Sequence, residues 1–380
     1  EEDKDLLIQY RLSRHIPQYD GIVQSFLSVT LRLLLVRHGL STFNLEGRIQ
    51  GRNDLSSLTE KGTQQAIATG RCLSDLQIKA IYSSPLQRAA KTTENLLGEL
   101  SQKPKVIFDE DLMEVDLGCW SGMTIREVQA NFPEIYQTWK TNPEEIILTD
   151  NNGKEFQPIK ELIDQSRTFI KRLIELNPLD EETTILIVAH NAILRCLILE
   201  FLGHPKQGFR RLKLDNASLS VINLKSSLLK TYQAQVECLN NTAHLNSNIS
   251  KKRDGGRLIL VRHGETNWNL ESRFQGQIDI PLNENGKAQA KAAKSFLSEL
   301  PLNKAFSSSM SRSRETAETI LESHPGVELE LKKGLIEIGH GLWEGKLESE
   351  IKSEWSELLR TWQIHPEAVQ MPEGETIYDV

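Results

Sequence analysis

The sequence predicts an α/β protein in which helices cover a mostly parallel sheet, and it predicts two tandem copies of that domain. Two observations lead to this fold class: short apolar segments alternate with helical ones, and one long stretch of sequence occurs twice. The chain has 380 residues, of which 38% are hydrophobic and 26% are charged. Such a composition suits two globular domains with their own cores and excludes a disordered or collagen-like chain.

The repeat is clearest at two heptapeptides, LLLVRHG at 33–39 and LILVRHG at 258–264. Because solenoid repeats span only about 20–50 residues, a repeat this far apart indicates a duplicated domain. The second lobe is shorter than the first, and we expect it to be incomplete at its C-terminus. We divide the chain into four segments: an N-terminal extension 1–30, a first lobe 31–232, a polar linker 233–256 and a second lobe 257–380.

Strands and helices are expected to alternate along the first lobe. The segments expected to form strands are short and apolar, at 31–36, 80–84, 106–108 and 183–189. The segments expected to form helices are 64–73, with Thr59 as N-cap, 86–100, 159–176 and 192–202. The spacing of apolar residues in 1–28 predicts one or two short amphipathic helices packed against a lobe.

Charged residues follow three of these strands, at the edge of a parallel sheet where ligands bind. Arg37 and His38 close the first strand, Arg88 begins the helix after the second, and His190 closes the last. Two guanidinium groups suit a phosphoryl group, because their planar forks pair with its oxygens. One histidine can attack phosphorus, and the other can stabilise the transition-state charge. Glu114 can protonate the leaving alkoxide and then activate water.

The second lobe repeats four of these five residues, as Arg262, His263, Arg312 and Glu337. A single Arg-His pair at a strand end is more often a surface pair, and a lone Glu a solvated loop residue. The duplication favours the catalytic interpretation for both copies. Further candidate substrate contacts are Gly39, Asn44, Arg48 and Asn191 in the first lobe, and Gly264, Asn269 and Arg273 in the second. Asn44 and Arg48 either line the phosphate pocket or brace its loop.

The combination of motifs resembles the histidine phosphatase superfamily, which includes phosphoglycerate mutase and fructose-2,6-bisphosphatase. The motifs are Arg-His-Gly after a strand, Ser-Ser-Pro-x-x-Arg at a helix start, Glu114 before Gly-x-Trp, and Val-Ala-His190. They cover nearly all of 31–225 and recur over 257–380. The resemblance implies a three-layer sandwich of the phosphoglycerate mutase-like type. It also implies a phosphohistidine at His38 within a pocket of Arg37, Arg88 and His190, with no metal and no organic cofactor.

Three hypotheses about function remain. Only 76 residues separate Glu114 from His190, whereas the family's mutases carry a longer insertion there, so a phosphatase acting on a small phosphorylated metabolite is favoured. The stretch RHGLS at 37–41 and Tyr136-x-x-Trp139 resemble plant-type 2-carboxyarabinitol-1-phosphate phosphatases, which suggests a sugar phosphate. The alternatives are mutase-type phosphoryl transfer and, mainly for the second lobe, a regulatory module that binds a phosphorylated ligand without turnover.

Composition excludes several other classes of protein. The net charge of −7 argues against a nucleic-acid-binding surface, and no apolar run reaches the roughly 18–20 residues of a membrane span. The four cysteines are scattered, which excludes a zinc ribbon or a disulfide scaffold and favours a reducing, cytoplasmic location. The acidic first residues resemble neither a signal peptide nor a transit peptide. The oligomeric state is left open.

Overall fold

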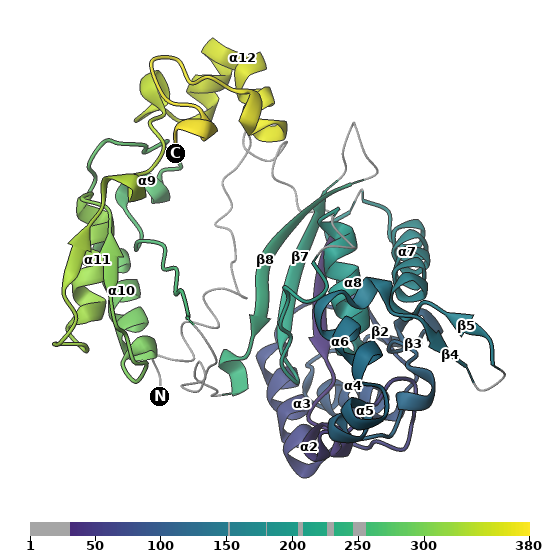
Figure 1. Cartoon of the computed structure of the whole chain (residues 1–380). Coiled ribbons are helices and arrows are strands. Elements are labelled where there is room, and N and C mark those ends of the chain that lie inside the picture. The colour runs from purple at the N-terminus through teal and green to yellow at the C-terminus, as the bar shows by residue number, and fades with distance from the viewer. Residues whose placement is uncertain (1–30, 151–152, 180, 204–207, 226–231, 246–255) are drawn as a thin grey trace. The chain divides into compact units, whose positions relative to one another are not determined.

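The computed structural model describes residues 31–150, 153–179, 181–203, 208–225, 232–245 and 256–380 (Figure 1). These residues form two compact units, one within 31–245 and the other within 256–380, and each is described by itself. The helices predicted for residues 1–28 lie outside the described residues.

The first unit is built on a six-stranded sheet with the order β3-β2-β6-β1-β7-β8. Four neighbouring strands are parallel, and β7 runs antiparallel to β1. The strands are β1 (Leu31–Arg37), β2 (Ala80–Ser83), β3 (Lys105–Phe108), β6 (Thr183–Ala189), β7 (Leu219–Lys225) and β8 (Gln233–Asn241). The mostly parallel sheet is therefore confirmed.

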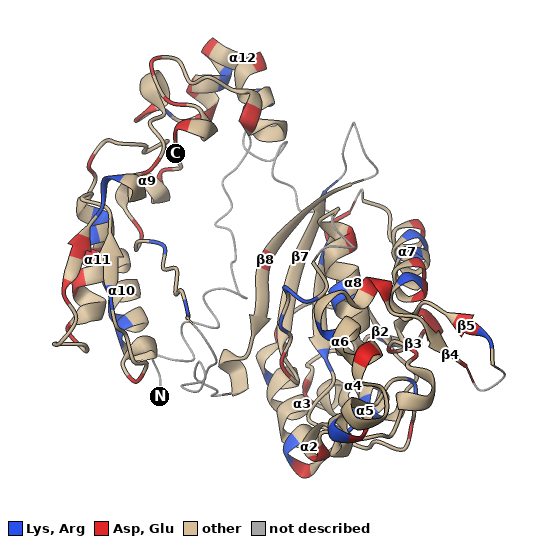
Figure 2. Ribbon diagram, in the orientation of Figure 1, with Lys and Arg blue, Asp and Glu red and all other residues tan. Residues whose placement is uncertain are grey.

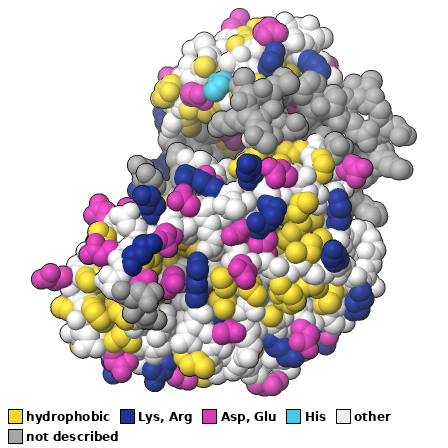
Figure 3. All heavy atoms as spheres, turned by 90° about the vertical axis from the view of Figure 1, so that its right-hand side faces the viewer, with side chains coloured by type: hydrophobic (Ala, Val, Ile, Leu, Met, Phe, Trp, Pro, Cys, Tyr) yellow, Lys and Arg dark blue, Asp and Glu magenta, His cyan; other side chains and the backbone are white. Residues whose placement is uncertain are grey.

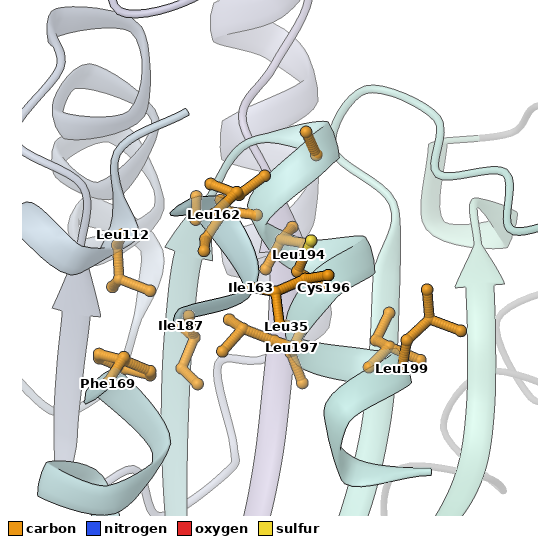
Figure 4. Packing of buried hydrophobic residues seen from close by; sticks show 14 of the residues in the cluster. Leu35, Leu112, Leu162, Ile163, Phe169, Ile187, Leu194, Cys196, Leu197 and Leu199 are labelled. Carbon is orange, nitrogen blue, oxygen red and sulfur yellow. The ribbon is translucent and has the colours of Figure 1, made fainter. Parts of the chain in front are cut away.

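Helices cover both faces of this sheet, so the three-layer sandwich is also confirmed. Successive side chains of β1 point to opposite faces. Leu33 and Leu35 join the core cluster under α7 and α8, whereas Leu34 and Val36 join the cluster under α3 and α4. Figure 4 shows Leu35 with residues of α7 and α8 in the first of these clusters. The four helices are α3 (Glu60–Cys72), α4 (Gln87–Glu99), α7 (Pro158–Leu176) and α8 (Asn191–Phe201).

One predicted boundary differs from the structure, and several elements were not predicted. The segment 233–241 was assigned to the linker because of its polar residues, but it forms the outer strand β8. Only one face of this strand packs on the core, so apolar and polar residues alternate along it. Several strands and helices of the first unit were not predicted from the sequence. They are β7, the short strands β4 (Leu148–Thr149) and β5 (Glu155–Phe156), and helices α2 (Thr42–Glu46), α5 (Ile125–Asn131) and α6 (Pro133–Thr141).

An aromatic cluster joins α5 and α6 to the rest of the first unit. Trp120 is fully buried, and its ring centroid lies 6.1–6.3 Å from those of Phe132, Tyr136 and Trp139. Trp139 in turn contacts Phe209 with its centroid 6.1 Å away. Trp120 and Trp139 are therefore packing residues.

The second unit repeats the helices α2 to α6 of the first unit and the loops between them, but its sheet is smaller. Its β9 and β10 pair in parallel, as β2 and β3 do. Leu258 and Leu260, which match residues of β1, form no strand and are 80% and 84% exposed. The elements of this unit are β9 (Ala305–Ser307), β10 (Leu329–Leu331), α9 (Asn267–Leu270), α10 (Glu284–Leu297), α11 (Ser311–Leu321) and α12 (Glu348–Ile364).

Charges of both signs are interspersed over the surface. Helix α7 carries basic and acidic residues along its length (Figure 2), and the face in Figure 3 shows both signs between apolar patches. Within the described residues, no helix combines the length and apolarity that a membrane span requires. All four cysteines are described, and none of them forms a disulfide.

Candidate active site

Three strand ends bring the predicted catalytic residues together in the first unit. Because β6 lies between β1 and β2, the residues that follow these strands become neighbours. The backbone N–H of His38 donates to Ala189 at 2.9 Å, and that of Ser84 donates to Val188 at 3.0 Å. The rings of His38 and His190 consequently lie with their centroids 5.1 Å apart.

His38 has the geometry of a nucleophile. Its side chain is buried, and its Nδ1 lies 2.7 Å from the carbonyl oxygen of Gly39. Because a carbonyl can only accept, Nδ1 must carry the proton, which leaves the lone pair on Nε2. Burial lowers the pKa of His38 well below its usual value, and the charges of Arg37 and Arg88 lower it further. His38 is therefore neutral at pH 7, as nucleophilic attack requires.

The loop after His38 is held against helices α3 and α4 by close backbone contacts. A Cβ atom on Gly39 would lie 2.4 Å from the carbonyl oxygen of Gly62, so only glycine fits there. The N–H of Gly39 donates to Thr92 at 3.1 Å. Gly39 was predicted to contact the substrate, and the structure gives it a structural reason as well.

Two guanidinium groups flank the histidines in fixed positions. Arg88 is completely buried and donates to the carbonyl oxygens of Asn53 at 3.0 Å and Gly51 at 2.8 Å. Arg37 donates to Leu214 at 2.6 Å. Burial lowers the pKa of Arg37 to about 10, so it keeps its charge at neutral pH. The Nε atoms of both arginines are buried without a hydrogen-bond partner, which leaves donors for an anion.

His190 is oriented by a serine that the sequence analysis did not assign a role. Its Nε2 lies 2.8 Å from Oγ of Ser84, and its buried Nδ1 has no partner. The N–H of Leu86 already donates to that Oγ. The Ser84 hydroxyl can donate to Nε2, and in that tautomer the imidazole proton lies on Nδ1. Burial, followed by Arg88, lowers the pKa of His190 well below its usual value.

Glu114 lies beside His190 at the start of α8. Its Oε1 accepts hydrogen bonds from the backbone N–H groups of Val115, Ala192 and Ile193 at 3.0–3.2 Å, and the side chain is largely buried. The N-terminus of a helix carries partial positive charge, which suits a carboxylate. The structure therefore brings Glu114 to the same strand ends as the two histidines and two arginines.

Asn44 and Arg48 form hydrogen bonds within the loop after His38 and to two neighbouring loops. Arg48 donates to Glu46 at 2.7 Å and to the carbonyl oxygen of Gly122 at 2.8 Å. Oδ1 of Asn44 accepts from Asn216, whose Nδ2 also donates to the carbonyl oxygens of His38 and Gly39 at 3.1 and 3.3 Å. These contacts favour the loop-bracing alternative. Asn216 was missed, because only tertiary contact brings its loop to His38.

The second unit repeats the local hydrogen bonds of the first, but its candidate site residues are more exposed to solvent. Arg312 donates to Gly276 and Ile278 at 2.8 and 3.1 Å, as Arg88 does to its own loop. His263 is half-buried, and Arg262 and Glu337 are exposed. Arg273 and Asn269 repeat the bonds of Arg48 and Asn44 within their loop, and Gly264 approaches Gly286 as Gly39 approaches Gly62. A cavity of about 290 Å³ is lined by His263, Ser308, Arg312 and Glu337, among others.

The sequence profile of the histidine phosphatase superfamily (branch 1) matches residues 33–236 and 258–380. The chain belongs to this superfamily. The two matched segments correspond to the two structural units, so each unit is a copy of the histidine phosphatase domain. The predicted resemblance to the histidine phosphatase superfamily is confirmed.

Named relatives of this histidine phosphatase include two plant proteins. A probable 2-carboxy-D-arabinitol-1-phosphatase of Arabidopsis thaliana is 34% identical over 64% of this chain and 49% of its own length. A 2-carboxy-D-arabinitol-1-phosphatase of Triticum aestivum is 29% identical over 87% of this chain and 71% of its length. The chain thus spans about half of the first relative. Among solved structures, Bacillus stearothermophilus YhfR matches with a TM-score of 0.50 and 26% identity, over 57% of this chain and 99% of its own.

The residues that the structure describes include no cluster of three or more His, Cys, Asp or Glu side chains able to hold a metal ion. The groups assembled at the strand ends are instead two neutral histidines, two arginines and one carboxylate. That set can bind an anion, supply a nucleophile and exchange a proton.

Proposed function

We propose that the chain is a phosphomonoesterase that transfers the phosphoryl group of a small phosphorylated metabolite to His38 and then to water. The observation that carries this proposal is the orientation of His38. Its Nδ1 proton is held by Gly39, and its basic Nε2 belongs to a ring that is 5.1 Å, between centroids, from His190. The charges of Arg37 and Arg88 act on both histidines.

The first half-reaction forms a phosphohistidine. The lone pair of His38 Nε2 attacks phosphorus, and the bond from phosphorus to the leaving oxygen breaks. Glu114, in its protonated form, donates its proton to that oxygen, so an alcohol departs. The arginines and Nδ1–H of His190 bind the equatorial oxygens, where negative charge is spread in the transition state.

The second half-reaction restores the enzyme. Glu114, now a carboxylate, takes a proton from water while the water oxygen attacks phosphorus. The N–P bond breaks, its electron pair returns to His38, and inorganic phosphate leaves. Each group ends in the protonation state in which it began, so no cofactor is required by this sequence of steps.

A mutase would return the phosphoryl group to a second substrate hydroxyl instead of water. His190 follows Glu114 by 76 positions, and the described residues of the segment between them include α5, α6, α7, β6 and the short β4–β5 pair. This segment favours water as the acceptor, and the plant relatives named as 2-carboxy-D-arabinitol-1-phosphatases support a phosphorylated sugar acid as substrate. A phosphate-binding regulatory role is kept for the second unit, because His263 is half-buried and Glu337 is exposed.

The test is release of inorganic phosphate from a panel of sugar phosphates, 3-phosphoglycerate and phosphoserine. We expect release to exceed isomerisation of 3-phosphoglycerate, with or without 2,3-bisphosphoglycerate, and to persist in EDTA. Rapid isomerisation with little phosphate release would establish the mutase alternative. No release from any member of the panel, by folded protein, would overturn the proposed function.

A further inference from the structure

Beside the phosphate pocket of the first unit lie two arginines that the proposed mechanism does not use. Arg195 projects from α8, one turn after Asn191, and Arg210 follows Phe209 in the next described segment. The guanidinium carbons of Arg195 and Arg210 lie 5.5 and 5.9 Å from the centroid of the Phe209 ring. Two positive charges therefore border one aromatic side chain.

Neither arginine has a carboxylate partner among the described residues. Arg195 donates no hydrogen bond there, and its Nε is buried without an acceptor. The terminal nitrogens of Arg195 are not among the buried atoms that lack a partner, and its side chain is only partly buried. Unpaired, partly desolvated guanidinium groups are costly unless a ligand supplies the acceptor.

Arg210 is held in place by its neighbours rather than by a charge. Its guanidinium carbon lies 4.6 Å from the Trp139 ring centroid. Its Nε and Nη2 donate to the backbone carbonyl oxygen of Trp139, which leaves Nη1 without a partner. A cation stacked on aromatic rings is oriented in advance for a ligand.

Arg195 is also close enough to the catalytic residues for their charges to interact. The charge of Glu114 acts on Arg195, and Arg195 acts in turn on Arg37 and on Arg210. Glu114 hydrogen-bonds the first turn of α8, and Arg195 lies in the second turn of that helix. Arg195 therefore lies near the catalytic residues, and Arg210 lies near Arg195.

We propose that Arg195 and Arg210 form a subsite for a carboxylate, so that the substrate is a phosphomonoester of a hydroxy acid or sugar acid. The inference rests on the proposed function and narrows its substrate class. A planar carboxylate matches the few donors that remain, namely the terminal nitrogens of Arg195 and Nη1 of Arg210. Asn191, whose buried Oδ1 has no donor, is placed to accept from a hydroxyl between the two anionic ends.

The experiment compares substrates that differ only in the carboxylate. The pairs are 3-phosphoglycerate with glycerol 3-phosphate, and phosphoserine with phosphoethanolamine. We expect kcat/KM for phosphate release to be roughly 10- to 100-fold higher for the acid of each pair, as for one charge-assisted contact. In Arg195→Gln that ratio should fall towards one, and Arg210→Gln should lower it less.

A surface arginine provides the matched control. Arg167 forms ion pairs with Glu200 of α8 and with Asp164, and Arg167→Gln should keep the wild-type ratio. If wild type hydrolyses both members of each pair equally, or if Arg195→Gln keeps the preference, the carboxylate subsite is wrong although the phosphatase function stands. A stronger preference for fructose 1,6-bisphosphate over fructose 1-phosphate would show that the subsite takes a second phosphate instead. If no phosphoester is hydrolysed, the proposed phosphatase function is wrong, and the carboxylate subsite is wrong as well.

Discussion

The two units contain the same loops around a histidine but give it different surroundings. In both, the histidine Nδ1 is bonded to the next carbonyl, the glycine N–H to a threonine, and the arginine to two loop carbonyls. His38, however, lies at the end of a strand with neighbours on both sides, whereas His263 follows residues that form no strand. Local sequence is therefore enough to build the loop, and the sheet is needed to enclose it.

The proposed catalytic acids, Glu114 and Glu337, also differ in their surroundings. Glu114 is bonded to the start of α8 and largely buried, whereas Glu337 accepts from the N–H of Ile338 alone and is exposed. Within the described residues, the second unit has no counterpart of β6 and α8. The apolar residues Leu258 and Leu260 are exposed for the same reason. Because electrostatic stabilisation needs a site that excludes water, we propose that the first unit, whose nucleophile and acid are buried, turns over substrate.

The largest expected difference between the units concerns the nucleophile. His38→Ala should lower kcat by roughly 10³-fold or more, because a covalent nucleophile has no substitute in the pocket. His263→Ala should retain most of the activity. Phosphate release from the preferred substrate measures both variants, and a large loss in His263→Ala with little in His38→Ala would reverse the assignment of the two units.

The next largest difference between the units is expected in the hydrolysis rate when Glu114 or Glu337 is replaced. Glu114→Gln keeps the shape of the side chain but removes its proton, so hydrolysis of alkyl phosphates should fall by roughly 10²–10⁴-fold. The loss should be smaller for p-nitrophenyl phosphate, whose leaving group needs no proton. Glu337→Gln is the matched control and should change either rate little. Equal losses for both kinds of leaving group in Glu114→Gln would remove Glu114 from the role of acid.

A smaller effect is expected for the serine behind His190. Ser84→Ala should lower kcat about 5- to 10-fold with little change in KM, because a hydrogen bond contributes about 1 kcal/mol and orients the imidazole. Ser308→Ala, at the matching position, should have no such effect, since among the described residues the Oγ of Ser308 bonds the N–H of Met310 and no histidine. Recovery of kcat in Ser84→Thr would support orientation by the hydroxyl, and a Ser84→Ala enzyme with wild-type kcat would exclude it.

The stability of the first unit should depend on pH. The pKa values of His38 and His190 are lowered by burial, and that of buried His244 falls to about 4. Below about pH 6.5 the unfolded chain binds more protons than the folded one, so the free energy of unfolding of the first unit should fall with pH. For His244 the loss ends near pH 4. Denaturant titrations at several pH values measure this slope, which should be shallower in His244→Gln.

The strand ends of the catalytic sheet were predictable from sequence, whereas the contacts behind them were not. Buried parallel strands are continuous apolar runs, so β1 and β6 and the histidines that follow them were found. The outer strand β8 has only alternating apolar residues and was assigned to the linker. Ser84 belongs to the Ser-Ser-Pro-x-x-Arg motif, but its bond to His190 is made by tertiary packing. The contacts of Asn216 and Arg195 also depend on tertiary packing, and no local pattern distinguishes these two residues from ordinary polar ones.

The central claim is that His38 carries the phosphoryl group during turnover. Rapid acid-free quenching of wild type with labelled substrate, followed by peptide mapping, tests this directly. We predict an acid-labile phosphate on the peptide that contains His38, absent from His38→Ala and present at wild-type level in His263→Ala. Label on the His263 peptide, or steady turnover with no labelled histidine at any time, would contradict the account.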